Sequence, residues 1–129
     1  MLVVEDNPNL RINLSKKLTD SGFICELVQN ENEAMDKLSS TLRAIVADIN
    51  LSEAGGSIAG GILLAEKLEG RKIPIILISH DPWYYLPDKD SQQFKKMQED
   101  QSIVSVIDRN KGEEFYEELI RTLKKTING

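Results

Sequence analysis

Acidic residues directly follow two of the apolar runs in this sequence. The run MLVV leads into Glu5 and Asp6, and the run AIVA leads into Asp48. Carboxylates that gather without compensation disfavour each other's charged form and raise each other's pKa. A hard divalent cation is the natural compensation, because Mg²⁺ takes oxygen ligands in near-octahedral geometry and keeps several waters. These carboxylates, together with the backbone carbonyl of Asn50, therefore predict a Mg²⁺ site.

A hydroxyl and two cations follow the later apolar runs. Ser79 closes the run IPIILIS, and Arg109 and Lys111 come shortly after the run IVSVID. A hydroxyl and a cation together can hold an oxyanion on the side of the site that faces away from the metal. Metal, carboxylate, hydroxyl and cation are the groups that transfer of a phosphoryl group to an aspartate requires. The sequence thus predicts a phosphoryl-transfer site in which Ser79 and a cation contact the phosphoryl oxygens.

Short runs rich in β-forming residues alternate with segments of helical periodicity, and these elements must position the site. The β-rich runs predict strands at 2–4, 23–28, 44–49, 73–79 and 103–108. The periodic segments predict helices at 9–21, 32–41, 60–68, about 92–101 and 112–127. Repeated alternation of this kind predicts an α/β fold, in which a parallel sheet has helices on both faces. Ligands of such sheets bind at the carboxyl ends of the strands, where the acids, the hydroxyl and the cations stand.

The first predicted helix carries its own boundary signals. Asn7 is a good N-cap, Pro8 suits the first helical position, and Gly22 suits the residue after the helix. Leucines at every fourth position give the helix one apolar stripe. These signals predict a helix that begins directly behind the acidic pair.

Length, charge and cysteine content exclude several classes of protein. A chain of 129 residues fits one domain, and its net charge of −5 predicts repulsion from nucleic-acid backbones and anionic membranes. No stretch approaches the roughly 20 apolar residues of a membrane span. Cys25 is the only cysteine, so no internal disulfide can form. We expect a cytoplasmic domain that binds neither nucleic acid nor membrane directly.

Four segments of the chain together resemble the signature segments of a protein family. LVVEDN, AIVADINL, IPIILIS and VIDRNKGEEFYEELI are similar, in order and spacing, to those of the response-regulator receiver domain, the phosphoacceptor of two-component and phosphorelay signalling. The resemblance covers essentially the whole chain. It implies a doubly wound, flavodoxin-like sheet of five parallel strands in the order 2-1-3-4-5. We expect a single receiver-like domain at 1–129, with a lengthened loop at about 80–93 and no output domain within these residues.

The resemblance also implies a role for each residue of the predicted site. Asp48 would accept a phosphoryl group from a histidine kinase or a phosphotransfer protein, while Glu5 and Asp6 hold Mg²⁺ beside it. Ser79 would bind one phosphoryl oxygen, and a basic residue another. The phosphorylated domain would then act on a downstream protein or a fused output domain. No conventional enzyme activity is expected, beyond Mg²⁺-dependent autophosphorylation from a donor and self-dephosphorylation.

The chain departs from the family pattern around the phosphate pocket. Receiver domains usually carry Lys after the fifth strand, whereas Arg109 stands there in this chain. The distance to the last helix favours Arg109 as the phosphate-binding cation, and Lys111 is the alternative. His80 replaces a residue that is normally small. Asn50 and Asp81 occupy positions that influence hydrolysis of the acyl phosphate, so Asp81→Ala should slow the decay of the phosphorylated protein; an unchanged decay rate would exclude that role.

Two other functions fit parts of the same sequence. A pseudo-receiver, which keeps the fold as a protein-binding module without phosphorylation, is favoured by Arg109, by His80 and by the lack of an aromatic residue shortly before the basic one. The acidic pair, Asp48 and Ser79 favour the phosphorylated switch instead. A haloacid-dehalogenase-type hydrolase needs a second Asp shortly after its nucleophile, and Asn50 stands at that position. We therefore expect the phosphorylated switch rather than a hydrolase.

Overall fold

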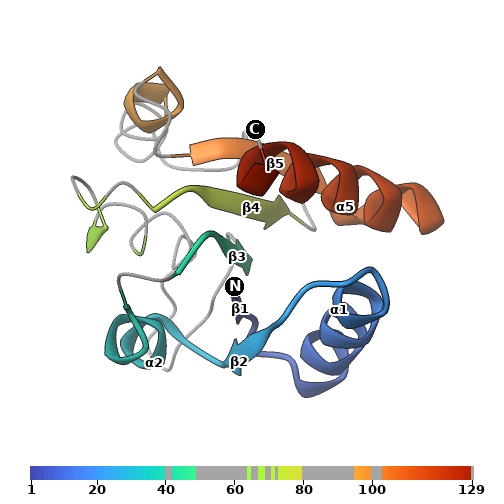
Figure 1. Ribbon diagram of the computed structural model, residues 1–129, viewed down its shortest axis with the longest axis horizontal. Helices are drawn as coiled ribbons and strands as arrows, with labels where there is room; N and C mark the ends of the chain where they lie inside the picture. The colour runs from blue at the N-terminus through green and yellow to red at the C-terminus, as the bar shows by residue number, and fades with distance from the viewer. Residues whose placement is uncertain are drawn as a thin grey trace.

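The described part of the chain, in the computed structural model, comprises residues 1–39, 42–48, 64, 67–68, 71, 73–79, 95–99 and 103–128. Its strands are β1 (Leu2–Val4), β2 (Glu26–Val28), β3 (Ile45–Asp48), β4 (Ile75–Ser79) and β5 (Ile103–Asp108). Its helices are α1 (Pro8–Asp20), α2 (Glu31–Asp36) and α5 (Glu113–Asn128), and the 3₁₀ turn η2 (Arg109–Lys111) precedes α5 (Figure 1). Residues 95–99 form a further helical segment.

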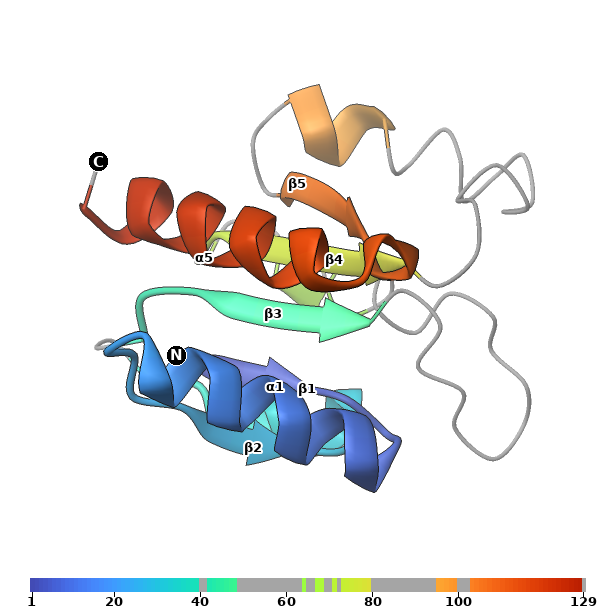
Figure 2. The same ribbon diagram turned by 90° about the vertical axis from the view of Figure 1, so that its right-hand side faces the viewer.

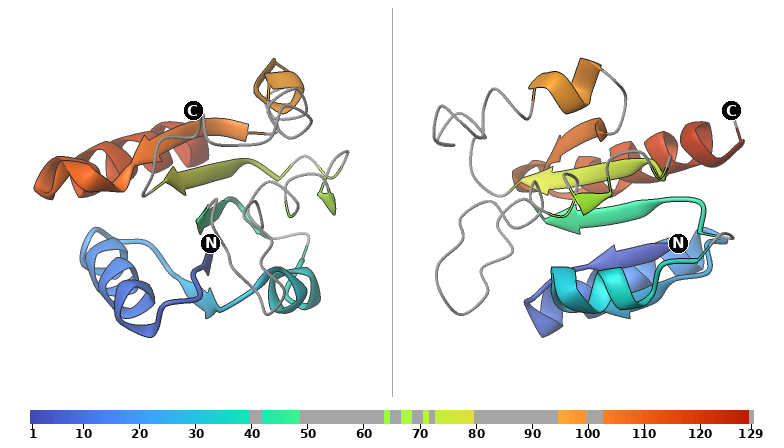
Figure 3. Two further views of the ribbon diagram at one scale, coloured as in Figure 1. Left: turned by 180° about the vertical axis from the view of Figure 1, so that it is seen from behind. Right: turned by 90° about the vertical axis from the view of Figure 1, so that its left-hand side faces the viewer.

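The five strands form one parallel sheet with the order β2-β1-β3-β4-β5. The strand arrows in Figure 2 point the same way, so the carboxyl ends of the strands share one edge of the sheet. Figure 1 and Figure 3 show α1 and α5 on one face of the sheet, with α2 and the segment 95–99 on the other. The predicted α/β architecture, its strand order and its helices on both faces are confirmed.

Apolar side chains of the strands alternate between two cores, one on each face of the sheet. Val3 packs into the core under α1 and α5, together with Leu14 and Leu119. Its strand neighbours Leu2 and Val4 pack into the other core, under α2 and the segment 95–99. The central strand β3 is buried at every position. Because both faces of the sheet are covered, the central strands are apolar almost throughout their length.

The boundaries of α1 agree with the signals in its sequence. The Asn7 side chain accepts hydrogen bonds from the backbone N–H groups of Asn9 and Leu10, at 3.0 and 3.2 Å, and Pro8 takes the first helical position. Behind the helix, Gly22 adopts a positive φ of 96°, a conformation that residues with a Cβ avoid. The predicted cap, first residue and stop of this helix are confirmed.

The strand β2 is shorter than its sequence pattern predicts. The strand expected at 23–28 covers only Glu26–Val28. Since β2 lies at the edge of the sheet, it can pair only along its neighbour β1, which offers three residues. Phe23 instead lies in the turn that closes the C-terminal end of α1, because its backbone N–H donates to the Leu18 carbonyl at 3.1 Å. Its side chain packs on the core under α1 and α5.

The helix α2 is also shorter than expected. The sequence predicts a helix at 32–41, whereas α2 spans Glu31–Asp36. Its last turn tightens at Lys37, whose backbone N–H donates to the carbonyl three residues earlier. Ser39, which follows the helix closely, is of a residue type with low helix propensity, and this favours the early end. The helix expected at 60–68 lies largely outside the described residues. Of the helix expected at about 92–101, residues 95–99 are described, and they are helical as predicted.

The helix α5 is amphipathic and packs on the same face of the sheet as α1 (Figure 1). It buries Phe115, Leu119 and Leu123, and charged residues occupy its exposed side. Gly112, with a positive φ of 65°, separates it from η2. In the part of the chain that the structure describes, neither α5 nor any other helix combines the length and apolar character that a membrane span requires.

Candidate functional site

The parallel register brings Glu5 and Asp48 to the same level of the carboxyl edge. Val4 of β1 pairs with Ala47 of β3, and the two acids are the residues that follow this pair. Glu5 is 1% exposed and Asp48 is 3% exposed, and within the described residues these are the buried acids. The sequence predicted that the first and third strands would meet through their acids, and the structure places these two side by side.

Glu5 is held in place through its backbone and one carboxylate oxygen. Its N–H donates to the Val28 carbonyl at 3.1 Å, and its carbonyl accepts from Nη1 of Arg11 at 2.9 Å. Its Oε1 accepts from the backbone N–H of Asn7 at 3.2 Å. Its Oε2 is buried and finds no hydrogen-bond partner among the described residues. The charge on that oxygen must therefore be met by a proton or by a cation.

The surroundings of Glu5 favour its neutral form. Burial has the largest effect and the neighbouring Asp48 carboxylate adds to it, so that the pKa of Glu5 rises to about 8. The Asn7 N–H and the Arg109 guanidinium act in the opposite direction. Without a further cation, Glu5 thus retains a proton at neutral pH, and a metal ion would have to displace it.

Arg109 reaches into the site from the turn after β5. Its Nη1 lies 3.5 Å from Oε2 of Glu5, and its side chain is 7% exposed. At that distance the contact is an ion pair rather than a well-formed hydrogen bond. The guanidinium also lies over the ring of Phe115, 5.5 Å from its centroid, so α5 supports it from behind. Neither Nη atom has a hydrogen-bond partner within the described residues.

Lys111, the alternative cation, lies on the surface instead. Its Nζ is 3.2 Å from Oε2 of Glu118 on α5, and its side chain is 45% exposed. The short turn between β5 and α5 separates the two cations, because Asp108 caps η2 through the N–H of Asn110 at 2.8 Å. The structure thus places Arg109 against Glu5 and Lys111 in a surface ion pair.

The donors of a metal site are only partly assembled. Within the described ranges, no three His, Cys, Asp or Glu side chains lie close enough to hold a metal ion. Glu5 and Asp48 come together, while the half-buried Asp6 does not complete a trio with them. The pair nevertheless suits Mg²⁺, because carboxylate oxygens are its preferred ligands and Oε2 of Glu5 is buried without a donor. A Mg²⁺ site with Asp6 as a further ligand stays a prediction.

Several predicted site residues fall outside the described part of the chain. These are Asn50, His80 and Asp81, and the loop at about 80–93 that contains two of them. Ser79 is described as the last backbone position of β4, paired with Asp108 of β5, while its side chain lies outside the description. The roles that the sequence predicts for these residues stay predictions.

Two contacts in the site were missed by the reasoning from sequence. The Arg109–Glu5 ion pair joins two residues that are far apart in the sequence and spans the carboxyl ends of β3 and β4. No local sequence pattern predicts it. The bond from Arg11 to the Glu5 carbonyl had a weak signal, because Arg11 follows the predicted N-cap by one helical turn. A side chain at that position can reach back to the loop before the helix.

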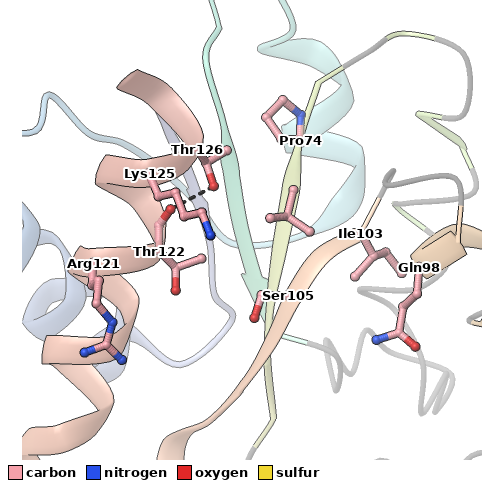
Figure 4. Close-up of a pocket in the computed structure, with 9 residues that line it drawn as sticks. Pro74, Gln98, Ile103, Ser105, Arg121, Thr122, Lys125 and Thr126 are labelled. Atoms are coloured by element: carbon pink, nitrogen blue, oxygen red, sulfur yellow. Dashed lines mark hydrogen bonds between the residues drawn. The ribbon is translucent and has the colours of Figure 1, made fainter. Parts of the chain in front are cut away.

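A surface groove lies away from the acids. An open groove of about 790 Å³ lies between the segment 95–99, β5 and α5 (Figure 4). Pro74, just before β4, and Ile103, which begins β5, line it, so it stands at the amino ends of these strands. The Lys125 and Arg121 side chains of α5 also line it. The groove is therefore separate from the carboxyl edge that holds Glu5 and Asp48.

Solved structures are similar to this fold over its whole length. A response regulator receiver protein from Pseudoalteromonas atlantica is 19% identical, with a TM-score of 0.75, over 99% of this chain and 96% of its own. The signal receiver domain of an HD domain-containing protein from Pseudomonas fluorescens Pf-5 is 15% identical, with a TM-score of 0.74, over 98% and 92%. The response regulator TrrA from Thermotoga maritima, in complex with Mg²⁺ and BeF, is 23% identical, with a TM-score of 0.69, over 95% and 96%.

Two further comparisons, which use the amino-acid sequence alone, found no match. No protein-family model matches the chain, and the search of curated proteins finds no match either. The identities to the three solved structures run from 15% to 23%, so the likeness establishes the fold. In each comparison it spans nearly the whole of both chains. This chain has the fold of a response-regulator receiver domain.

Proposed function

We propose that this chain is a phosphoacceptor switch that receives a phosphoryl group on Asp48, with Mg²⁺, from a histidine kinase or phosphotransfer protein. One observation carries the proposal: a buried aspartate ends the central strand, with a buried glutamate beside it and a buried guanidinium against that glutamate. A buried acid pair is costly to keep without a function that uses it. The receiver fold, which binds Mg²⁺ and BeF in TrrA, supports the same assignment.

In the proposed reaction, a carboxylate oxygen of Asp48 attacks the phosphorus of a phosphohistidine. The O–P bond forms as the N–P bond breaks, and the electron pair of the broken bond stays on the imidazole, which takes up a proton. Charge spreads over the phosphoryl oxygens during transfer. The Nη groups of Arg109, which lack hydrogen-bond partners within the described residues, can donate to these oxygens, as can the hydroxyl of Ser79.

Glu5, Asp48, Asp6 and the Asn50 carbonyl are the groups that would hold the metal. Bound Mg²⁺ would supply charge neutralisation between the acids and the phosphoryl oxygens. The chain's own part is to keep the two buried carboxylates in register, which β1 and β3 do through their pairing. Asn50 and Asp81 would modulate the lifetime of the phosphorylated state, and His80 the access to it. The proposed setting is the cytoplasm, and the proposed output is a downstream protein or a fused domain.

The test is phosphorylation by a small donor. The protein is incubated with MgCl₂ and acetyl phosphate, and intact-protein mass is recorded for the wild type, Asp48→Asn and Asp108→Asn. The wild type should gain the mass of one phosphoryl group, and Asp48→Asn should gain none. Asp108→Asn is the matched control, because Asp108 also ends a strand but is exposed, and its side chain caps η2, a task that Asn performs equally well.

The Arg109–Glu5 ion pair favours one alternative, a pseudo-receiver that binds a partner protein without phosphorylation. In that case Arg109 is a permanent counter-ion of the acids, and the site is closed to a metal. If the wild type neither gains mass nor binds beryllofluoride in the presence of Mg²⁺, the phosphoacceptor switch is excluded and the pseudo-receiver remains. A mass gain that is lost in Asp48→Asn excludes it.

A further inference from the structure

The loop between β1 and α1 carries the acidic pair, and Arg11 closes this loop. The Arg11 backbone N–H donates to the Asn7 carbonyl at 2.9 Å, so Arg11 stands one turn into α1. Its side chain turns back, and Nη1 donates to the Glu5 carbonyl at 2.9 Å in a partly buried bond. That carbonyl belongs to the planar peptide group that joins Glu5 to Asp6. One guanidinium therefore holds the peptide group between two acids of the predicted metal site.

We propose that Arg11 is a positioning residue, which orients Glu5 and Asp6 toward a divalent cation by holding the peptide group between them. The inference rests on the proposed function and deepens it, because it takes the cation to bind at the same acids. Arg11 itself would not contact the cation, since both are positively charged and its partner in this loop is a backbone carbonyl.

The other hydrogen bonds of Glu5 hold its nitrogen and one carboxylate oxygen. Its N–H donates to the Val28 carbonyl at 3.1 Å, and its Oε1 accepts from the Asn7 N–H at 3.2 Å. The bond from Arg11 adds the carbonyl, so the direction of the peptide that leads to Asp6 is set as well. Groups that orient metal-ligating side chains in this way typically change metal affinity by about 10- to 100-fold when they are removed.

The helix α1 itself gains nothing from a cation at this position. Arg11 closes the first turn of α1, where the partial positive charge of the helix end disfavours cations. That turn contains no acidic residue to offset the charge of the guanidinium. A cation that the helix disfavours is better explained by the loop that its side chain holds.

The charge of Arg11 acts on an acid outside the predicted metal site. Glu33 of α2 accepts two hydrogen bonds from Gln29, from its backbone N–H at 2.8 Å and from its side-chain amide at 3.0 Å. These bonds lower the pKa of Glu33 most, and the Arg11 guanidinium adds to the effect. Arg11 thus acts between the loop after β1 and the loop after β2, and it has a counter-ion that leaves the carboxylate of Glu5 available.

The experiment compares Mg²⁺ affinities without a phosphodonor, read from the backbone amide shifts of ¹⁵N-labelled protein as MgCl₂ is added. Arg11→Met keeps an apolar stem and removes the donor, and it should bind Mg²⁺ about tenfold more weakly than the wild type. Loss of a positive charge near the site would by itself strengthen cation binding, so the expected change has the opposite sign to a charge effect. Lys16→Met removes the same charge from an exposed position of α1, and its affinity should stay within about twofold of the wild type.

Urea unfolding in EDTA shows that each protein is folded under the conditions of the titration, so that a loss of stability does not enter the comparison. Equal or tighter Mg²⁺ binding by Arg11→Met overturns the inference. The same weakening in Lys16→Met also overturns it, as does a wild type that binds no Mg²⁺.

A second measurement uses the wild type alone and applies if Arg11→Met does not fold. Wild-type protein is labelled with ¹⁵N on arginine, and the guanidinium signals are recorded at low temperature. A hydrogen bond from Nη1 to a carbonyl hinders rotation about the Nε–Cζ bond, so Arg11 should give separate Nη signals, whereas the exposed Arg43 should not. The separate signals should persist when Mg²⁺ saturates the protein. A freely rotating Arg11 guanidinium in the Mg²⁺-bound protein overturns the inference, because a broken bond cannot orient the acids.

Failure of the inference and failure of the proposed function give different results. Phosphorylation of Asp48 by acetyl phosphate, with a Mg²⁺ affinity that does not depend on Arg11, refutes the positioning role and leaves the switch. Weaker Mg²⁺ binding by Arg11→Met, without phosphorylation of the wild type, refutes the switch and leaves the positioning role.

Discussion

Glu5 affects both the stability of the fold and the proposed chemistry. It is buried, it faces Asp48, and its pKa rises to about 8, chiefly through burial and then through that neighbour. The folded protein therefore binds a proton that the unfolded chain has lost in the pH range between the usual pKa of Glu, near 4.5, and 8. Where the folded state binds more protons than the unfolded state, stability falls as pH rises.

The free energy of unfolding of the metal-free protein should accordingly decrease between pH 5 and pH 8. The contribution of Glu5 amounts to about 1.4 kcal/mol per pH unit at most in that window. Glu5→Gln keeps the shape of the side chain and removes the titration, so the variant should gain stability over the wild type as pH rises. Urea unfolding in EDTA at pH 5, 6, 7 and 8 measures the difference.

Glu117→Gln is the control for this titration, because Glu117 lies exposed on α5. Its stability should follow the wild type at every pH. If Glu5→Gln also runs parallel to the wild type from pH 5 to pH 8, the raised pKa of Glu5 is wrong.

At the residue scale, the sequence predicted that Glu5 and Asp48 meet, but not the ion pair that Arg109 makes with Glu5. It did favour Arg109 over Lys111 as the phosphate-binding cation. Glu5 and Asp48 end neighbouring strands of a parallel sheet, and strand order alone puts them together. Arg109 reaches Glu5 because Phe115 supports its guanidinium and because the η2 turn directs Lys111 to Glu118. These are packing contacts between distant segments, and no local pattern encodes them.

The element whose ends are set by hydrogen bonding and conformation of neighbouring residues, α1, was predicted best. α1 starts and stops where its cap residue, its proline and its glycine indicate, because each acts on neighbouring backbone groups. β2 and α2 were predicted too long. The length of β2 is set by its partner β1, and α2 ends in a turn that its apolar spacing does not reveal.

The cap of α1 provides a prediction at this scale. The Asn7 side chain accepts two backbone N–H groups, so Asn7→Ala should lower the free energy of unfolding by about 1 kcal/mol. Asn13→Ala is the matched control, because Asn13 is exposed in the body of α1, where Ala is the better helix former. Chemical denaturation midpoints compare the two variants. Equal midpoints for Asn7→Ala and the wild type would show that the cap contributes no net stability.

On the scale of the whole molecule, the site exists only in the folded sheet. Glu5, Asp48 and Arg109 come from β1, β3 and the turn after β5, and strand pairing and the packing of α5 bring them together. The unfolded chain has no equivalent arrangement. Any ligand that binds these groups must therefore stabilise the fold by mass action.

This linkage gives a prediction for the intact protein. Mg²⁺ with beryllofluoride, at about 100 times its dissociation constant, should stabilise the fold by roughly 2.7 kcal/mol, which raises the Tm of a domain of this size by several degrees. Asp48→Asn should lose the increment due to beryllofluoride, because the fluoride complex requires a carboxylate oxygen of the proposed phosphoacceptor. Asp108→Asn should retain it, since Asp108 is exposed and its side chain caps η2, as an Asn would. Thermal unfolding is measured with Mg²⁺ alone, with beryllofluoride alone and with both, which separates the two contributions. An equal rise in Tm for the wild type, Asp48→Asn and Asp108→Asn would place the ligand away from Asp48.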